Sequence, residues 1–235
     1  MRKSPSAAFT LIEMMTVIAV IVILTGMVLS IAGYATRKGA LARAEGEIQM
    51  LISACESYKS ENGNYPRDVP DGGGGVTDML SPKQHFSPVS PLYANASLFL
   101  YKQLSGDKTG GGSNLPDGIP DENEPRYFKD VDMGKILNTR KNPTTKAIIQ
   151  VNYLQDPFGF SYGYSTVAAK NEEDFQRRLK LATGNTPPER IKNDVTGGFN
   201  SGSFDLWSTG GDNTPGSPGG EDRMGLKWAK WVKNW

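Results

Sequence analysis

Four acidic side chains gather in a glycine-rich stretch close to the C-terminus. They are Asp205, Asp212, Glu221 and Asp222, and five glycines stand between the first and the last of them. Calcium prefers about six to eight hard oxygen ligands, including backbone carbonyls of flexible loops, and glycine lets a backbone fold tightly enough to supply them. The acids do not follow the order of an EF-hand loop. From the residues alone, a calcium loop and a set of solvated acidic turns both remain open.

A second acidic run, residues 117–124, could also hold a cation. Pro116, Pro120 and Pro125 punctuate this run, and proline is typical of turns at a protein surface. We therefore expect an exposed, turn-rich loop here rather than a metal site.

Few residues of the chain are suited to catalysis. It has one cysteine, Cys55, and one histidine, His85, which excludes multi-histidine and cysteine-cluster metal centres. No G-x-S-x-G elbow occurs, so a serine hydrolase of that type is not expected. The 26 basic and 25 acidic residues leave a net charge of +1, without the large basic surface of a nucleic-acid-binding protein. We predict neither an enzyme nor a nucleic-acid binder.

The N-terminal region contains a long apolar segment. Residues 14–36 include no charged side chain, and an uncharged run of this length is sufficient to span a bilayer. Arg2 and Lys3 precede it, which favours a cytoplasmic N-terminus. The simplest interpretation is a signal anchor that places the remainder of the chain outside the cytoplasm.

Glu13 lies at the edge of the apolar segment, where an unpaired carboxylate is costly. If the chain were cut between Ala8 and Phe9, the new α-amino group of a neighbouring copy could neutralise Glu13. The alternative is that the Glu13 side chain reaches the lipid headgroups without a partner, as long polar side chains do near a membrane surface.

Apolar residues continue at helical spacing beyond residue 36. Six of them recur at intervals of three and four: Leu41, Ala44, Ile48, Leu51, Cys55 and Tyr58. This spacing is typical of a helix with one buried face. It predicts one helix over residues 9–62, whose first half crosses a membrane and whose second half packs on a globular head, residues 63–235. Gly63 and Pro66 end the helix, and Cys55 is expected to be a core residue.

The head contains short apolar runs separated by glycine and proline. Strand candidates are Ala147–Tyr153, Phe160–Val167 and Phe204–Trp207, which are rich in β-forming residues. Short helices are expected over residues 92–104 and 171–181. In the tail, Trp228, Trp231 and Trp235 recur at helical spacing and predict an amphipathic turn that caps the sheet. The mixture indicates an α+β fold, with the long helix packed on a small antiparallel sheet head with long loops.

The N-terminal motif resembles a known family. Residues 8–13, AFTLIE, followed by the apolar segment, are similar to the processing site of type IV pilins and type II secretion pseudopilins. The resemblance implies that residues 1–8 form a leader peptide. It also implies that a prepilin peptidase cuts between Ala8 and Phe9 and methylates the new amine, and that Glu13 serves in subunit docking. Ala8 stands where the family usually has glycine, and Ser30 where many relatives have proline.

Motifs in the head resemble the major pseudopilin of type II secretion. Residues 58–66, YKSENGNYP, are similar to its helix exit, and residues 156–164, DPFGFSYGY, to its DPWGxPYxY turn. Residues 205–213, DLWSTGGDN, are similar to its DLYSxGADG stretch, and the final Asn-Trp matches as well.

The resemblance implies a structural calcium ion in the loop of residues 205–226. Asp212 and the Thr209 carbonyl correspond to two of its ligands, and Asp222 to a second acidic ligand with Glu221 adjacent. Asp205 and Ser208 are then expected to be strand-end and turn residues.

The function implied is that of a structural subunit of the periplasmic pseudopilus of a type II secretion system. Its partners would be copies of itself, other pseudopilins, the prepilin peptidase and the inner-membrane secretion platform. It would be a single-pass inner-membrane protein with a cytoplasmic N-terminus and a periplasmic head, and then part of a periplasmic filament. Three alternatives are a major or minor pilin of a type IV pilus or competence system, a signal-anchored periplasmic binding module that does not polymerise, and an anchored hydrolase.

Overall fold

The computed structural model describes seven stretches of the chain. They are residues 10–69, 75–110, 115–128, 136–181, 197–200, 202–211 and 231–235, and the side chains of residues 28–32 are not among them. The chain divides into two compact units, Met1–Ala42 and Arg43–Trp235.

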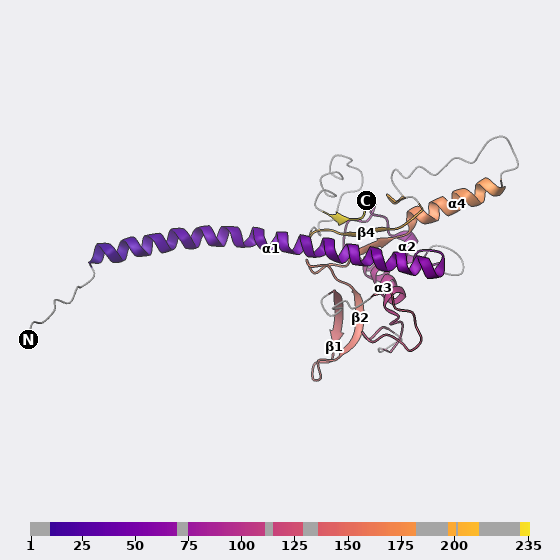
Figure 1. Ribbon diagram of the computed structural model, residues 1–235, viewed down its shortest axis with the longest axis horizontal. Coiled ribbons are helices and arrows are strands. Elements are labelled where there is room, and N and C mark those ends of the chain that lie inside the picture. Colours follow the sequence, from indigo (N-terminus) through magenta and orange to yellow (C-terminus); the bar gives the residue numbers. More distant parts are fainter. Residues whose placement is uncertain are drawn as a thin grey trace, which may run out of the picture. The chain divides into compact units, whose positions relative to one another are not determined.

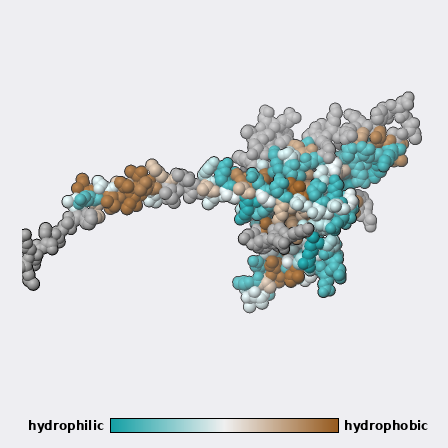
Figure 2. All heavy atoms as spheres, viewed as in Figure 1, coloured by the Kyte–Doolittle hydropathy of each residue, from teal (hydrophilic) through white to brown (hydrophobic). Residues whose placement is uncertain are grey.

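The predicted long helix is present as α1, Leu11–Asn62. In the first unit its large apolar side chains are exposed, from Met14 at 44% to Leu11 at 77%, and Figure 2 shows them as a continuous apolar stretch. In the part of the chain that the structure describes, none of the helices combines the length and the apolar character needed to cross a membrane. The span over residues 14–36 therefore stays a prediction.

In the second unit, α1 buries the stripe that the sequence predicts. Ala44, Ile48, Leu51 and Cys55 are each at most 1% exposed. Cys55 is thus a core residue, and its burial raises the pKa of its thiol well above the usual range. The helix ends where Gly63 takes a φ of 79° and its N–H donates to the Lys59 carbonyl at 2.8 Å, because glycine adopts this left-handed conformation at little cost.

The described residues of the head form three further helices and two antiparallel sheets (Figure 1). The helices are α2 (Val76–Met79), α3 (Pro91–Ser105) and α4 (Val167–Leu181). One sheet is β1 (Leu137–Lys141) with β2 (Ile148–Leu154), and the other has the order β3-β4-β5: Gly163–Ser165, Asp205–Ser208 and Val232–Lys233. The α+β prediction is confirmed.

Several predicted elements differ from the structure. Val167, which we assign from sequence to a strand, begins α4, so this helix starts four residues before Asn171. The tail does not form a helical turn at Trp231 and Trp235. It forms β5 between them, because Asn234 exchanges hydrogen bonds with Leu206 of β4 (2.9 and 3.2 Å). Trp228 lies outside the described residues.

Trp207 is the centre of the head core. Its ring stacks on Trp231 with centroids 6.0 Å apart, and its indole N–H donates to the Tyr93 hydroxyl at 3.1 Å. Gly163 of β3 lies directly against the ring, since a Cβ on this glycine would be 2.2 Å from Trp207 Cε2. Trp231 and Trp235 both pack against Trp207 of β4 and so cover this sheet, as predicted, although they flank a strand and not a helical turn.

Candidate functional site

Glu13 is held by a reciprocal hydrogen-bonded cap at the first turn of α1. Its carboxylate accepts hydrogen bonds from the backbone N–H and the hydroxyl of Thr10, both at 2.8 Å, and its own N–H donates to Thr10 Oγ1 at 3.3 Å. This is a capping box, which satisfies backbone donors at a helix N-terminus. Our sequence interpretation missed Thr10, although the T-x-x-E spacing would have found it. Ala8 and Phe9 lie outside the described residues.

The three head motifs meet in space, although up to about 150 residues separate them in sequence. Tyr164 donates a hydrogen bond to the Pro66 carbonyl at 2.6 Å, which joins the second motif to the first. Tyr65 packs edge-on against Phe204, with ring centroids 4.9 Å apart. Ser208 Oγ donates to Asp156 Oδ2 at 2.5 Å, which joins the third motif to the second.

Asp156 organises a turn next to the start of the late loop, the name we use for the loop of residues 205–226. Its Oδ1 accepts hydrogen bonds from the backbone N–H of Phe158 at 3.0 Å and of Phe160 at 2.8 Å. Burial raises the pKa of Asp156, and the hydrogen bonds from Ser208, Phe160 and Phe158 oppose that rise. The Phe158 ring then packs on the late loop, since a Cβ on Gly211 would be 3.0 Å from Phe158 Cδ1.

The late loop contains a buried threonine directly after β4. Thr209 is 0% exposed, and among the described residues its Oγ1 has no hydrogen-bond partner. Gly210 and Gly211 follow with φ values of 62° and 83°, so the chain turns sharply after β4 as only glycine does readily. Asp205 begins β4, as expected, whereas Ser208, which we expected in the turn, is the last residue of the strand. Asp212, Glu221 and Asp222 lie outside the described residues.

The second acidic run forms a hydrogen-bonded turn, as predicted. Asp121 accepts hydrogen bonds from the backbone N–H of Lys108 at 2.9 Å and of Thr109 at 3.0 Å, and Lys108 Nζ lies 2.5 Å from Glu124. Within the described residues, no group of three or more His, Cys, Asp or Glu side chains is arranged to hold a metal ion.

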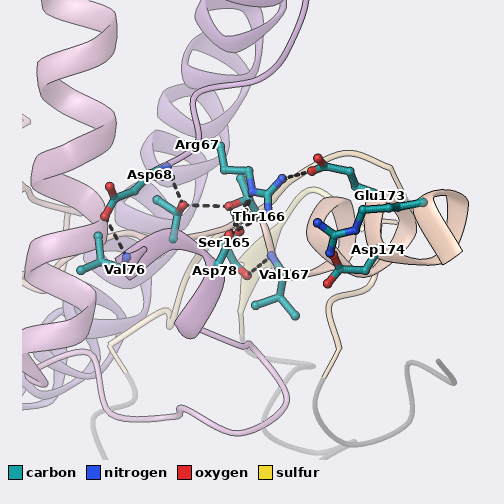
Figure 3. Close-up of polar contacts among 11 residues, drawn as sticks. Arg67, Asp68, Val76, Asp78, Ser165, Thr166, Val167, Glu173 and Asp174 are labelled. Atoms are coloured by element: carbon teal, nitrogen blue, oxygen red, sulfur yellow. Dashed lines mark hydrogen bonds and ion pairs between the residues drawn. The ribbon is translucent and has the colours of Figure 1, made fainter. Parts of the chain in front are cut away.

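A charge network centred on the buried Asp78, which the sequence did not predict, fixes the helix exit to the head (Figure 3). The Arg67 guanidinium donates to both carboxylate oxygens of Asp78 at 2.9–3.0 Å and also pairs with Glu173 of α4. Thr166 Oγ1 donates to Asp78 Oδ1 at 2.9 Å. The Asp78 side chain is only 1% exposed. No local pattern could have revealed this network, because Arg67 and Glu173 are 106 residues apart.

A long N-terminal helix and an α+β head are the architecture of the pilin-like class of protein. Residues 3–29 match the family model described as the prokaryotic N-terminal methylation motif. This motif is the N-terminal signature of type IV pilins and pseudopilins, so the chain carries the signature of that class. No curated protein and no solved structure matches the chain.

Proposed function

We propose that this protein is a pseudopilin that assembles into the periplasmic pseudopilus of a type II secretion system and so supports protein export. The methylation motif at residues 3–29 carries the proposal. The exposed apolar side chains of α1 between Leu11 and Met27 support it, because an apolar surface of this size requires lipid or another protein chain to cover it. The role is structural, without catalysis and without nucleic acid as partner.

The proposed life cycle follows from the same motif. The chain enters the inner membrane with a cytoplasmic N-terminus and a periplasmic head, and the prepilin peptidase removes residues 1–8. The mature chain then joins copies of itself and other pseudopilins on the inner-membrane secretion platform. Mass spectrometry of the mature protein tests this proposal: a methylated Phe9 is expected, and an intact Met1 would contradict it.

A pilin of a type IV pilus or competence system is the second candidate, because the matched motif is shared by pilins and pseudopilins. The two roles separate in a deletion strain. Loss of protein export with intact motility and DNA uptake supports the pseudopilin, and the reverse pattern supports the pilin.

We predict that Glu13→Gln abolishes filament assembly without preventing membrane insertion. Glutamine keeps a side-chain acceptor for the Thr10 cap but removes the charge that would attract a neighbouring α-amino group. Pelleting of sheared filaments measures assembly, and carbonate extraction of membranes measures insertion. Thr10→Val is the matched control, because it removes the hydroxyl and keeps the charge. Normal assembly of Glu13→Gln would exclude a docking role for the Glu13 charge.

Calcium is the structural ion that we propose for the loop of residues 205–226. Asp212, Asp222 and the Thr209 carbonyl would hold it, with Glu221 adjacent. The buried Thr209 hydroxyl, which has no hydrogen-bond partner among the described residues, and the left-handed Gly210 and Gly211 fit a loop that closes around a cation. Bound calcium would link the loop to the end of β4 and so stabilise the head.

Removing calcium is therefore expected to lower the melting temperature of the head. Saturation at about one hundred times the Kd contributes about 2.7 kcal/mol, which corresponds to about 5–10 °C for a chain of this size. Tryptophan emission of the full chain in detergent, with excess calcium or with chelator, measures the shift. Asp212→Ala should abolish it, and Glu122→Ala, an acid of the second run, should keep it. A shift that survives Asp212→Ala would exclude this site.

A further inference from the structure

The two-stranded sheet has a basic edge. Residues 136–155 contain three cations and no acid: Arg140 and Lys141 at the end of β1, and Lys146 in the turn that follows. All three are exposed, and among the described residues none of them forms an ion pair. Within the part of the chain that the structure describes, positive charge is therefore uncompensated along β1, which Figure 1 shows beside β2 and apart from β4.

The turn that follows the basic edge is held firmly. Asn142 Oδ1 accepts hydrogen bonds from the backbone N–H of Thr144 at 2.8 Å and of Thr145 at 3.1 Å. The Asn142 N–H donates to the Ala147 carbonyl at 2.8 Å. Arg140 and Lys141 are thus presented by an ordered hairpin, so little backbone entropy would be lost when they meet a partner.

The segment that runs past the opposite edge of this sheet is acidic, and we call this segment, residues 115–125, the acidic edge. Val151 is paired in register with Thr139 of β1, but its N–H donates to the Pro116 carbonyl at 2.7 Å. The Val151 N–H therefore points away from β1, and the segment around Pro116 lies along the other edge of β2. Residues 115–125 contain four acids and no cation: Asp117, Asp121, Glu122 and Glu124.

The acidic edge keeps most of its negative charge. The backbone hydrogen bond from Lys108 lowers the pKa of Asp121, so this carboxylate stays ionised. Lys108 pairs with Glu124, which offsets one of the four charges. Glu122 is exposed to solvent. β1 and the acidic segment that passes beside β2 therefore carry opposite net charges.

We propose that the basic edge of one copy, Arg140 and Lys141, docks on the acidic edge of a second copy, around Glu122 and Glu124. The proposal rests on the proposed filament, and it names the head surfaces that meet in it. The two surfaces are different parts of the same chain, so the contact is heterologous, and heterologous contacts that do not close into a ring build helical filaments. Opposite charges on the two edges set the orientation of neighbouring heads and disfavour like-to-like contacts.

Charge reversal of each edge tests the proposal with purified full chains that have been processed by prepilin peptidase. The polymers are pelleted after the detergent is diluted. Arg140→Glu/Lys141→Glu makes both edges acidic, and Glu122→Lys/Glu124→Lys makes the acidic edge basic. Each variant alone is expected to polymerise about tenfold less than wild type, because like charges then face each other. An equimolar mixture of the two variants should recover polymerisation, since their edges are complementary.

Two controls separate this contact from general charge effects. Arg178→Glu/Lys180→Glu, which reverses exposed cations of α4, should polymerise as wild type does. Raising the ionic strength from about 50 mM to about 500 mM should weaken wild-type assembly, because salt screens exposed charges.

The outcomes distinguish the edge contact from the proposed function. If wild type polymerises and the edge variants do so equally well alone, or if their mixture shows no recovery, the edge contact is wrong and the filament role stands. If wild type forms no polymer, the filament role fails and the edge contact with it.

Discussion

Arg67→Ala is expected to destabilise the head by about 3–5 kcal/mol, because it leaves the Asp78 carboxylate buried without its counter-charge. Asp78 receives two hydrogen bonds from Arg67 at 2.9 Å, and its side chain is 1% exposed. The melting temperature should fall by roughly 6–20 °C. All four tryptophans lie beyond residue 206, so tryptophan emission of the full chain in detergent reports the unfolding of the head alone.

Arg177→Ala is the matched control for Arg67. Arg177 pairs with Asp174 on the surface of α4, where its side chain is 67% exposed, and an exposed pair of this kind contributes at most about 1 kcal/mol. Adding Asp78→Asn to Arg67→Ala should restore part of the lost stability, because it removes the uncompensated charge. Equal stability of the Arg67→Ala and Arg177→Ala variants would show that the Asp78 carboxylate does not depend on Arg67.

Gly163→Ala is expected to cost about 3 kcal/mol or more, since overpacking a rigid core forces side chains and backbone to shift. The added Cβ would be 2.2 Å from Trp207 Cε2 and 2.4 Å from Cζ2. Trp207 has little freedom to move, because it is 0% exposed, stacked on Trp231 and hydrogen-bonded to Tyr93. Urea unfolding of the full chain, followed by tryptophan emission, measures the loss.

Gly46→Ala provides the comparison for Gly163. Gly46 lies in α1, and a Cβ there would meet no atom within 4 Å, so alanine should stabilise the helix by roughly 0.5–1 kcal/mol. The same substitution is thus expected to stabilise the protein at Gly46 and to destabilise it at Gly163. A Gly163→Ala variant that unfolds at the same urea concentration as wild type would exclude the close packing of Gly163 on Trp207.

Local patterns were sufficient to predict α1 over nearly its whole length. Its apolar period and Gly63 at its end each act within a few residues. The T-x-x-E cap at Thr10 and Glu13 is equally local, although we did not recognise it in the sequence. Backbone propensity and capping operate at that range, so a sequence pattern records them directly. The N-terminal motif is local for the same reason, and its match at residues 3–29 confirms it.

The head depended on contacts between distant residues. The tail became a strand because β4 offered it a hydrogen-bonding edge near Leu206, and that edge overrides the helical spacing of its tryptophans. The acidic ligands expected for calcium stay predictions, because Asp212, Glu221 and Asp222 lie outside the described residues. Thr209 is described, and the burial of its hydroxyl, without a partner in the described part of the chain, could not have been inferred from composition.

The processing motif, the long helix with its buried stripe and the α+β class of the head could be predicted from residue patterns alone. Folding was needed to reveal that Arg67 pairs with Asp78 and Glu173, that the three head motifs meet, and that an acidic segment passes beside β2. The difference lies in the sequence separation of the residues that interact. Helix periodicity and caps are set by residues close in sequence, whereas buried ion pairs and sheet edges form between segments that only folding brings together.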